Sequence, residues 1–198
     1  LFRSQRTKRM VRRTVWAIQK QLKSGEFEPE GVEVVFQGGR IDRVDTMETD
    51  DGKLYVRVID YKTGNTSFDL VSLYHGLQLQ LMIYMDGALT VEQNKHKNKE
   101  VIPAGVFYYN IKDPMIQEKI DADIETVQEK VLKELKMNGL VLKDKELVQK
   151  MDSSLMSIPV SFNKDGSFRK NSSVASKEQF DILNRYVKTK ISHIRQSI

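Results

Sequence analysis

Residues 40–62 read R-I-D-R-V-D-T-M-E-T-D-D-G-K-L-Y-V-R-V-I-D-Y-K and decide how this chain folds. Two runs rich in β-branched and aromatic residues, 40–47 and 54–61, flank a short polar segment and predict a β-hairpin. Asp50-Asp51-Gly52 suits a three-residue loop that ends with glycine in the left-handed conformation. A loop of that length sets the register of the whole hairpin.

In this register Asp42 stands directly across from Asp60. Other facing positions carry compatible pairs: Thr49 with Lys53, Val44 with Val58, and Asp45 with Arg57. A two-residue loop at Asp51-Gly52 would instead turn Asp42 to the opposite face of the sheet. The pairing of the two aspartates therefore depends on the turn type.

The charged end of the second run is costly to bury, so either the strand reaches the surface there or the two charges are held at a site. Asp60 and Lys62 point to the same face because side chains alternate along a strand. Opposed carboxylates repel unless a cation lies between them, and Mg²⁺ or Mn²⁺ prefers oxygen ligands. The Tyr61 backbone carbonyl could add a ligand to those from Asp42 and Asp60. Lys62 would lie beside a metal-bound water, which favours phosphodiester hydrolysis.

An Asp-x-Lys or Glu-x-Lys triplet alone is weak evidence, since the chain also contains Asp51-Gly52-Lys53 in the turn and Glu134-Leu135-Lys136 in a predicted helix. Residues 60–62 differ because they close an apolar strand and follow a second acid within the segment G-G-R-I-D-R-V-D, residues 38–45. From spacing alone, two interpretations stay open: a metal site, or a strand that simply reaches the surface at two charges.

Apolar periodicity and turn signals predict the other elements. Helices are expected over 5–23, 68–89, about 121–137, about 144–151 and from Ser176 onward, and further strands over 32–36 and 101–110. We place Ser67 near the N-cap of the second helix, Asn138-Gly139 at the end of the third, and Ser176 with Gln179 in a capping box. Pro103 indicates an edge or a bulge. We expect a single α/β domain with a central mixed sheet of about five strands flanked by helices.

Composition limits the chemistry. The chain has 198 residues, no cysteine and three histidines, so thiolate metal sites and a cysteine nucleophile are excluded and a reducing compartment such as the cytoplasm fits. No apolar run is long enough for a membrane span, and no signal peptide is expected. Residues 1–23 carry eight lysines and arginines and no acid, although the net charge is +5. Such a block is typical of a solvated helix face or of a contact with a polyanion.

Three segments together resemble a known family: G-R-I-D-R-V-D, V-I-D-Y-K-T-G and G-L-Q-L-Q-L-M-I-Y-M. The pattern is similar to that of RecB-type nucleases of the PD-(D/E)xK superfamily, and more narrowly to the nuclease domains of AddB-type subunits. The resemblance implies that Asp42 and Asp60 bind metal, that Lys62 is the lysine of the core motif, and that Gln80 and Tyr84 form the Q-x-x-x-Y element that completes the catalytic set.

The same resemblance implies a Mg²⁺- or Mn²⁺-dependent DNA exonuclease. It would process double-strand breaks for recombinational repair, with an AddA-type helicase-nuclease subunit as partner and a DNA single strand feeding the site. A stand-alone endonuclease of the same superfamily and a catalytically silent DNA-binding module are the alternatives. No G-x-x-x-x-G-K-[ST] loop is present, so no ATP-driven motor is expected within this chain.

The sequence departs from the family pattern at three places. Residues 1–25 lack the acid or histidine that related enzymes often place on a preceding helix, which leaves Glu33 as a substitute metal ligand. The link Gln37-Gly38-Gly39 looks short for the family. AddB-type proteins commonly hold a 4Fe-4S cluster through cysteines that flank the nuclease domain. Because this chain has none, we expect it to be a fragment of a longer protein.

Overall fold

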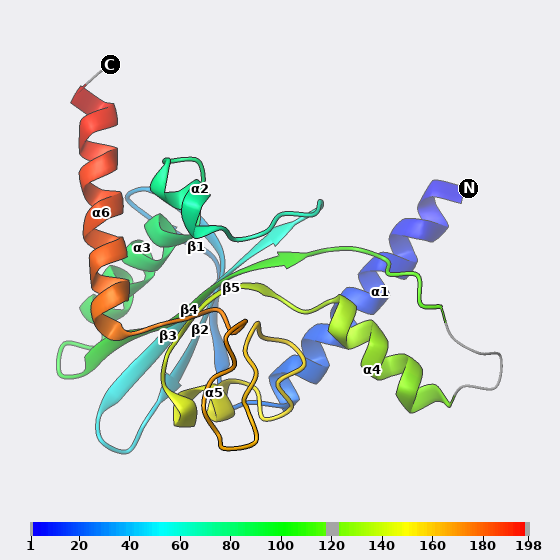
Figure 1. Ribbon diagram of the computed structural model, residues 1–198. Helices are drawn as coiled ribbons and strands as arrows, with labels where there is room; N and C mark the ends of the chain where they lie inside the picture. The colour runs from blue at the N-terminus through cyan, green and yellow to red at the C-terminus, as the bar shows by residue number, and fades with distance from the viewer. Residues whose placement is uncertain (1, 118–122, 197–198) are drawn as a thin grey trace.

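Six strands form one mixed sheet in the computed structural model, which describes residues 2–117 and 123–196 (Figure 1). They are β1 (Glu28–Phe36), β2 (Gly39–Glu48), β3 (Lys53–Lys62), β4 (Glu100–Asn110), β5 (Asn138–Leu142) and β6 (Val174–Ala175). The spatial order equals the chain order. The first three strands are antiparallel, β4 is parallel to β3, β5 is antiparallel to β4, and β6 is parallel to β5. The expected α/β fold with a mixed central sheet is confirmed.

Helices cover the sheet on two sides. They are α1 (Phe2–Lys23), α2 (Leu70–Tyr74), α3 (Gln80–Lys95), α4 (Ile124–Glu134), α5 (Lys145–Met151) and α6 (Lys177–Gln196). Figure 1 shows α3 and α6 together on one side and α1 with α4 on the other. No helix within the described ranges has the length and apolar character that crossing a membrane requires.

The hairpin register agrees with the prediction. The Thr49 N–H donates to the Lys53 carbonyl at 3.0 Å, and Gly52 has φ +80°, the left-handed conformation of the three-residue loop. Val44 pairs with Val58, and Asp45 with Arg57. These pairs fix which face of the sheet every side chain of β2 and β3 occupies.

The continuous helix predicted over 68–89 is wrong. Two helices replace it, and Gly76 with φ +81° separates them. The Leu77 N–H donates to the Ser72 carbonyl at 2.9 Å and the Gly76 N–H to the Leu73 carbonyl at 2.9 Å, a Schellman motif that ends α2. Asp69, rather than Ser67, caps α2. Gln80 therefore begins a new helix instead of lying inside an old one.

The end of the helix expected over 121–137 was misplaced, and residues 121–122 lie outside the described ranges. Helix α4 ends at Glu134, and Asn138-Gly139 opens β5, a strand that was not predicted. A Cβ on Gly139 would come within 1.9 Å of the Val106 carbonyl oxygen. Glycine is thus required here because two backbones approach closely across the sheet, not because a helix ends.

Two local predictions are confirmed. Val56 of β3 pairs with Pro103 of β4, but the next residue, Arg57, pairs with Gly105. β4 therefore carries one extra residue directly after Pro103, a bulge in a central strand. The Ser176 N–H donates to Gln179 Oε1 at 2.8 Å, and the Gln179 N–H donates to Ser176 Oγ at 3.3 Å, the reciprocal bonds of a capping box.

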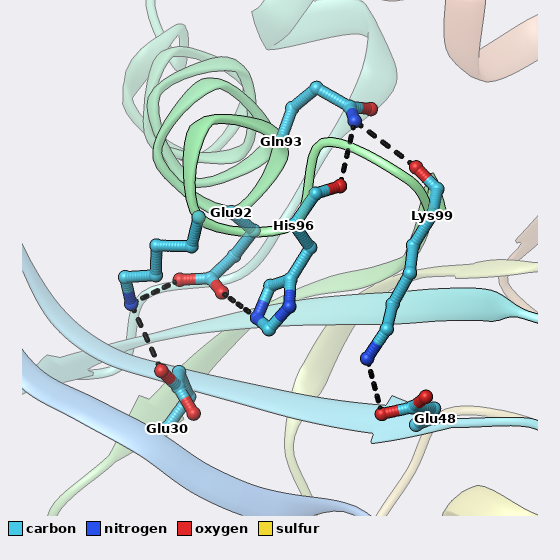
Figure 2. A network of polar contacts seen from close by, with 7 residues as sticks. Glu30, Glu48, Glu92, Gln93, His96 and Lys99 are labelled. Atoms are coloured by element: carbon cyan, nitrogen blue, oxygen red, sulfur yellow. Dashed lines mark hydrogen bonds and ion pairs between the residues drawn. The ribbon is translucent and has the colours of Figure 1, made fainter.

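The C-terminal end of α3 is held over β1 and β2 by ion pairs (Figure 2). Lys95 Nζ lies 3.0 Å from Glu30 of β1 and 2.8 Å from Glu92, a carboxylate that is buried. Lys99, in the loop after the helix, lies 2.6 Å from Glu48 of β2. These contacts fix one end of the helix whose other end reaches the candidate site.

Candidate active site

Four of the predicted residues form one continuous chain of polar contacts. Lys62, the last residue of β3, places its Nζ 2.7 Å from Asp60 Oδ2 and donates to Gln80 Oε1 at 2.8 Å. Gln80 Nε2 in turn donates to the hydroxyl of Tyr84 at 2.7 Å. The strand end and the first two turns of α3 therefore meet at these side chains, and α3 holds the lysine in place.

Asp42 joins the site through the backbone of β3. Asp42 directly precedes Arg43 in β2, and the pair of Arg43 with Ile59 is the last in the regular register of the hairpin. The Tyr61 N–H donates to Asp42 Oδ2 at 2.9 Å, so the carboxylate is fixed beside the end of β3. The regular pairing does not extend to Asp42 and Asp60; instead the Asp42 carboxylate caps the end of β3, close enough for its negative charge to raise the pKa of Asp60.

The electrostatics of Asp60 are unfavourable for an ionised carboxylate. Burial raises its pKa, the contact with Lys62 lowers it, the negative charge of Asp42 raises it again, and the net effect is a raised pKa. The Asp60 side chain is only 4% exposed. Its Oδ2 forms an ion pair with Lys62 but has no hydrogen bond of normal geometry within the described ranges. The single ammonium group of Lys62 cannot neutralise the negative charges of both Asp42 and Asp60.

These residues fit a hard divalent cation. Mg²⁺ is usually held by one or two carboxylates together with water and substrate phosphate oxygens, so Asp42 and Asp60 suffice as protein side chains. A cation would supply the positive charge that the buried Asp60 oxygen lacks. No group of three or more acid, histidine or cysteine side chains with metal-binding geometry occurs among the described residues. The fit therefore rests on two carboxylates.

Glu33 is not brought into this site. Its side chain is 68% exposed, and Oε2 lies 3.5 Å from Arg40 Nη1. The residue has φ +52°, which is rare outside glycine and re-aims the side chain relative to a regular strand. The structure thus leaves Glu33 in an exposed ion pair on β1.

Packing fixes Tyr84 and Lys62. The rings of Phe36 and Tyr84 meet edge to face with centroids 5.9 Å apart. Phe36 also lies over Gly87, where a Cβ would come within 2.4 Å of the ring. Lys62 Nζ is 5.5 Å from the centroid of Tyr108, a cation–π distance. A hollow of about 450 Å³ between α3 and α6 is lined by other residues, so the candidate site lies outside it, at the end of the strands.

The chain segment after Lys62 is fastened by residues that sequence reasoning missed. Asn110 accepts from the Thr66 N–H at 3.1 Å and donates to the Thr66 carbonyl at 2.9 Å. Asn138 donates to the same carbonyl at 2.8 Å and accepts from the Phe68 N–H at 2.6 Å. The two asparagines hold the segment between β3 and α2. The available signal was a polar residue at one end of a strand, Asn110 at the end of β4 and Asn138 at the start of β5.

The opposite face of the hairpin carries a separate charge cluster. Asp45, fully buried, pairs with Arg43 through Oδ1 at 2.6 Å and with Arg57 through Oδ2 at 2.8 Å. The Arg57 guanidinium also stacks over the ring of Phe27 at 4.8 Å. Burial lowers the pKa of Arg57. Burial also acts to lower the pKa of Arg43, but the hydrogen bonds and charges of Asp45 and Tyr61 together outweigh it, so the pKa of Arg43 is raised. The second acid of G-R-I-D-R-V-D is therefore structural.

Comparison with known proteins gives two findings. A family model described as "PD-(D/E)XK nuclease superfamily" matches residues 2–197. The chain is 42% identical to the B subunit of the ATP-dependent helicase/deoxyribonuclease of Lachnoclostridium phytofermentans, over 98% of its own length and 18% of that protein. The corresponding protein of Thermoanaerobacter sp. is 37% identical over 98% and 19%, and that of Clostridioides difficile is 38% identical over 96% and 18%. The chain thus spans about a fifth of the length of these relatives.

Proposed function

The chain belongs to the PD-(D/E)XK nuclease superfamily, and we propose that it hydrolyses DNA phosphodiester bonds with Mg²⁺ or Mn²⁺. The observation that carries the proposal is the contact chain from Asp60 through Lys62 and Gln80 to Tyr84, with Asp42 fixed beside it. A purely structural strand end needs no such arrangement, because neither the surplus acid nor the helix-held lysine improves packing.

Each residue has a separate role in this proposal. Asp42 and Asp60, with the Tyr61 carbonyl, would hold the cation, which supplies activation of water and charge stabilisation when bound. The Lys62 ammonium compensates negative charge that develops on the phosphate in the transition state. Gln80 accepts a hydrogen bond from Lys62 and so fixes the position of its Nζ. Tyr84 accepts from Gln80 and fixes the orientation of the amide.

We further infer the cellular task from the named relatives. Each is called the B subunit of an ATP-dependent helicase/deoxyribonuclease. By that likeness, the chain would act as the exonuclease domain of an AddAB-type complex in the cytoplasm, trimming DNA ends during recombinational repair. An AddA-type subunit would be its partner, and DNA single strands would feed the site. A 4Fe-4S cluster would belong to the longer protein, because this chain has no cysteine ligands.

The chain offers matched controls for the test. Asp60-Tyr61-Lys62 and Asp51-Gly52-Lys53 are both Asp-x-Lys triplets, and in each the lysine forms an ion pair with the aspartate. Linear single-stranded DNA with Mg²⁺ or Mn²⁺ is incubated with the parent chain and with four variants. The variants are D60N, K62A, D51N and K53A.

We expect cleavage that EDTA abolishes, a loss of at least about 10³-fold in D60N and K62A, and less than twofold change in D51N and K53A. Circular single-stranded DNA, which has no ends, should resist cleavage if the activity is exonucleolytic. Cleavage of circles would favour the endonuclease alternative. Binding of DNA without cleavage under any metal would overturn the proposal in favour of a silent binding module.

A further inference from the structure

Helix α1 carries positive charge that the rest of the described chain leaves uncompensated. Residues 1–23 contain no acid. Arg9 and Arg13 share a single carboxylate, Asp113, and Arg13 also donates to the Pro114 carbonyl at 2.7 Å. Two guanidinium groups on one acid leave an excess of positive charge even where the helix is paired.

Three further cations of α1 face solvent. Arg6, Lys8 and Arg12 are exposed, and within the described ranges none has a carboxylate partner within 4.0 Å. Lys8 and Arg12 are four residues apart and so lie above one another on the same helix face. Like charges at this spacing destabilise an isolated helix, so the arrangement costs stability without gaining an internal contact.

The helix is fixed near the candidate site. Ala17 packs with Val131 of α4 and with Leu135, the C-cap residue of that helix, and these contacts anchor the second half of α1. Asp113, which binds the first half, follows Asn110 by three residues, a span of at most about 11 Å. Asn110 is the register partner of Lys62 across β3 and β4. The first half of α1 is therefore tied to the chain just after the end of β4, the strand that pairs with β3 at Lys62, although α1 and α3 cover opposite sides of the sheet in Figure 1.

We propose that Arg6, Lys8 and Arg12 of α1 bind the phosphate backbone of the DNA strand that enters the site. The proposal rests on the proposed nuclease function for the identity of the polyanion. Exposed lysines and arginines that have no carboxylate partner within the described ranges suit the uniform negative charge of a sugar–phosphate chain. None of the three belongs to the contact chain of Asp60, Lys62, Gln80 and Tyr84, so they would bind the substrate outside the scissile bond.

Binding is measured separately from cleavage. The 198-residue chain and the variant R6Q/K8Q/R12Q are titrated with a fluorescein-labelled single-stranded 20-mer in EDTA, from 50 to 300 mM salt. A control variant, K97Q/K164Q/K170Q, removes three exposed lysines from loops away from α1 and has the same net charge. Arg9 and Arg13 are retained because they hold the helix. Circular dichroism checks that all three proteins fold.

We expect R6Q/K8Q/R12Q to bind at least tenfold more weakly at 100 mM salt, and the slope of log K against log [salt] to fall by about 2, since each single-strand phosphate contact contributes about 0.7. The control variant should lose less than threefold. With Mg²⁺, hydrolysis of bis(p-nitrophenyl) phosphate, which lacks the flanking phosphates of a DNA strand, should stay within twofold for both.

An unchanged salt slope in R6Q/K8Q/R12Q, or an equal loss in both variants, would overturn the proposal, because the cations would then act only through net charge. A loss of small-substrate hydrolysis in R6Q/K8Q/R12Q alone would also overturn it, since α1 would then support the site itself. If no protein cleaves any substrate, the nuclease proposal fails, whereas the EDTA titration still decides the role of α1.

Discussion

The two faces of the β2–β3 hairpin both bury charged side chains, but in different proportions. On the face away from α3, Asp45 lies between Arg43 and Arg57, and Asp152 is close enough to add a favourable charge to Arg57. On the α3 face, two acids share one lysine. The first face is balanced, with two acids and two cations, whereas the second holds a surplus negative charge.

The difference separates a structural cluster from a site. Buried ions stabilise a fold only when their partners are complete, because each unpaired charge keeps its desolvation cost. The balanced cluster satisfies this condition with residues of the chain itself. The α3 face does not: burial and the negative charge of Asp42 outweigh the contact with Lys62, so the pKa of Asp60 is raised. A bound cation could neutralise the surplus negative charge that the folded chain leaves on the α3 face.

Removing the central acid of the balanced cluster should have the largest effect on stability. Asp45→Asn leaves two buried arginines without their shared carboxylate, so we expect the free energy of unfolding to fall by about 3–5 kcal/mol. Urea denaturation measures it. Asp51→Asn, in an exposed ion pair, should leave the midpoint of urea denaturation nearly unchanged. A loss below about 1 kcal/mol in Asp45→Asn would show that the cluster is not structural.

Acid should weaken the same face through Asp152. Burial raises the pKa of Asp152, but hydrogen bonds from Ser154 and Ser157 outweigh it and hold the pKa below its ordinary value. A depressed folded-state pKa stabilises the protein above the unfolded value, about 3.9, and that contribution is lost as pH falls through the folded value.

The variant Asp152→Asn isolates this contribution. We expect it to lower the free energy of unfolding by about 2 kcal/mol at pH 7, since hydrogen bonds to a charged acceptor are lost. Below about pH 4 the difference from the parent should shrink. Denaturation curves at pH 3.5, 5 and 7 measure both. A difference independent of pH would mean that shape, not charge, explains the loss.

Neutralising the unbalanced face should stabilise the metal-free protein. Because the folded-state pKa of Asp60 is raised, its ionised form costs stability at pH 7, and Asp60→Asn removes that cost. We expect a gain of about 1 kcal/mol in EDTA that vanishes at acid pH and reverses when saturating Mg²⁺ stabilises only the parent. Thermal unfolding with and without Mg²⁺ measures it. If Asp60→Asn destabilised the metal-free protein, the charges on the α3 face would be balanced like those around Asp45, and the proposed difference between the two faces would be wrong.

The smallest effect should come from the end of the contact chain. Tyr84→Phe removes the acceptor for Gln80 and loosens the positioning of Lys62, so cleavage should fall roughly 3- to 10-fold, about 1 kcal/mol. The melting temperature should stay within a few degrees. Tyr74→Phe is the control, since that exposed ring lies on α2, outside the chain of contacts. Equal rates in Tyr84→Phe and the parent would remove Tyr84 from the site.

Local chemistry decided which parts of the fold were predictable. The hairpin register followed from Gly52, because a turn type is a property of a few adjacent residues. The Ser176–Gln179 capping box followed for the same reason. Gly76 carried an equally local signal, but the apolar spacing across it favoured one long helix, and only the Schellman bonds revealed the break.

Contacts between distant segments were beyond sequence reasoning. Gly139 is needed where β5 meets the carbonyl of Val106, a requirement that depends on the sheet and not on neighbouring residues. Likewise Tyr108 lies under Lys62 only because β4 pairs with β3 in a particular parallel register. Asp42, Asp60 and Lys62 could be proposed as a group because one hairpin carries all three. The link from Lys62 to α3 was suggested by family resemblance and not by spacing.

The break at Gly76 also places the N-terminus of a helix, with its positive electrostatic potential, next to the candidate site. Because α2 ends there, Gln80 is the first residue of α3, and the N-cap residue Leu79 makes no side-chain bond to the free N–H groups of the first turn. Aligned peptide dipoles give such an end about half a positive charge. A continuous helix would have placed Gln80 in its electrically neutral interior. The interruption of the helix thus brings a second source of positive potential close to Lys62, whose Nζ donates to the side chain of Gln80.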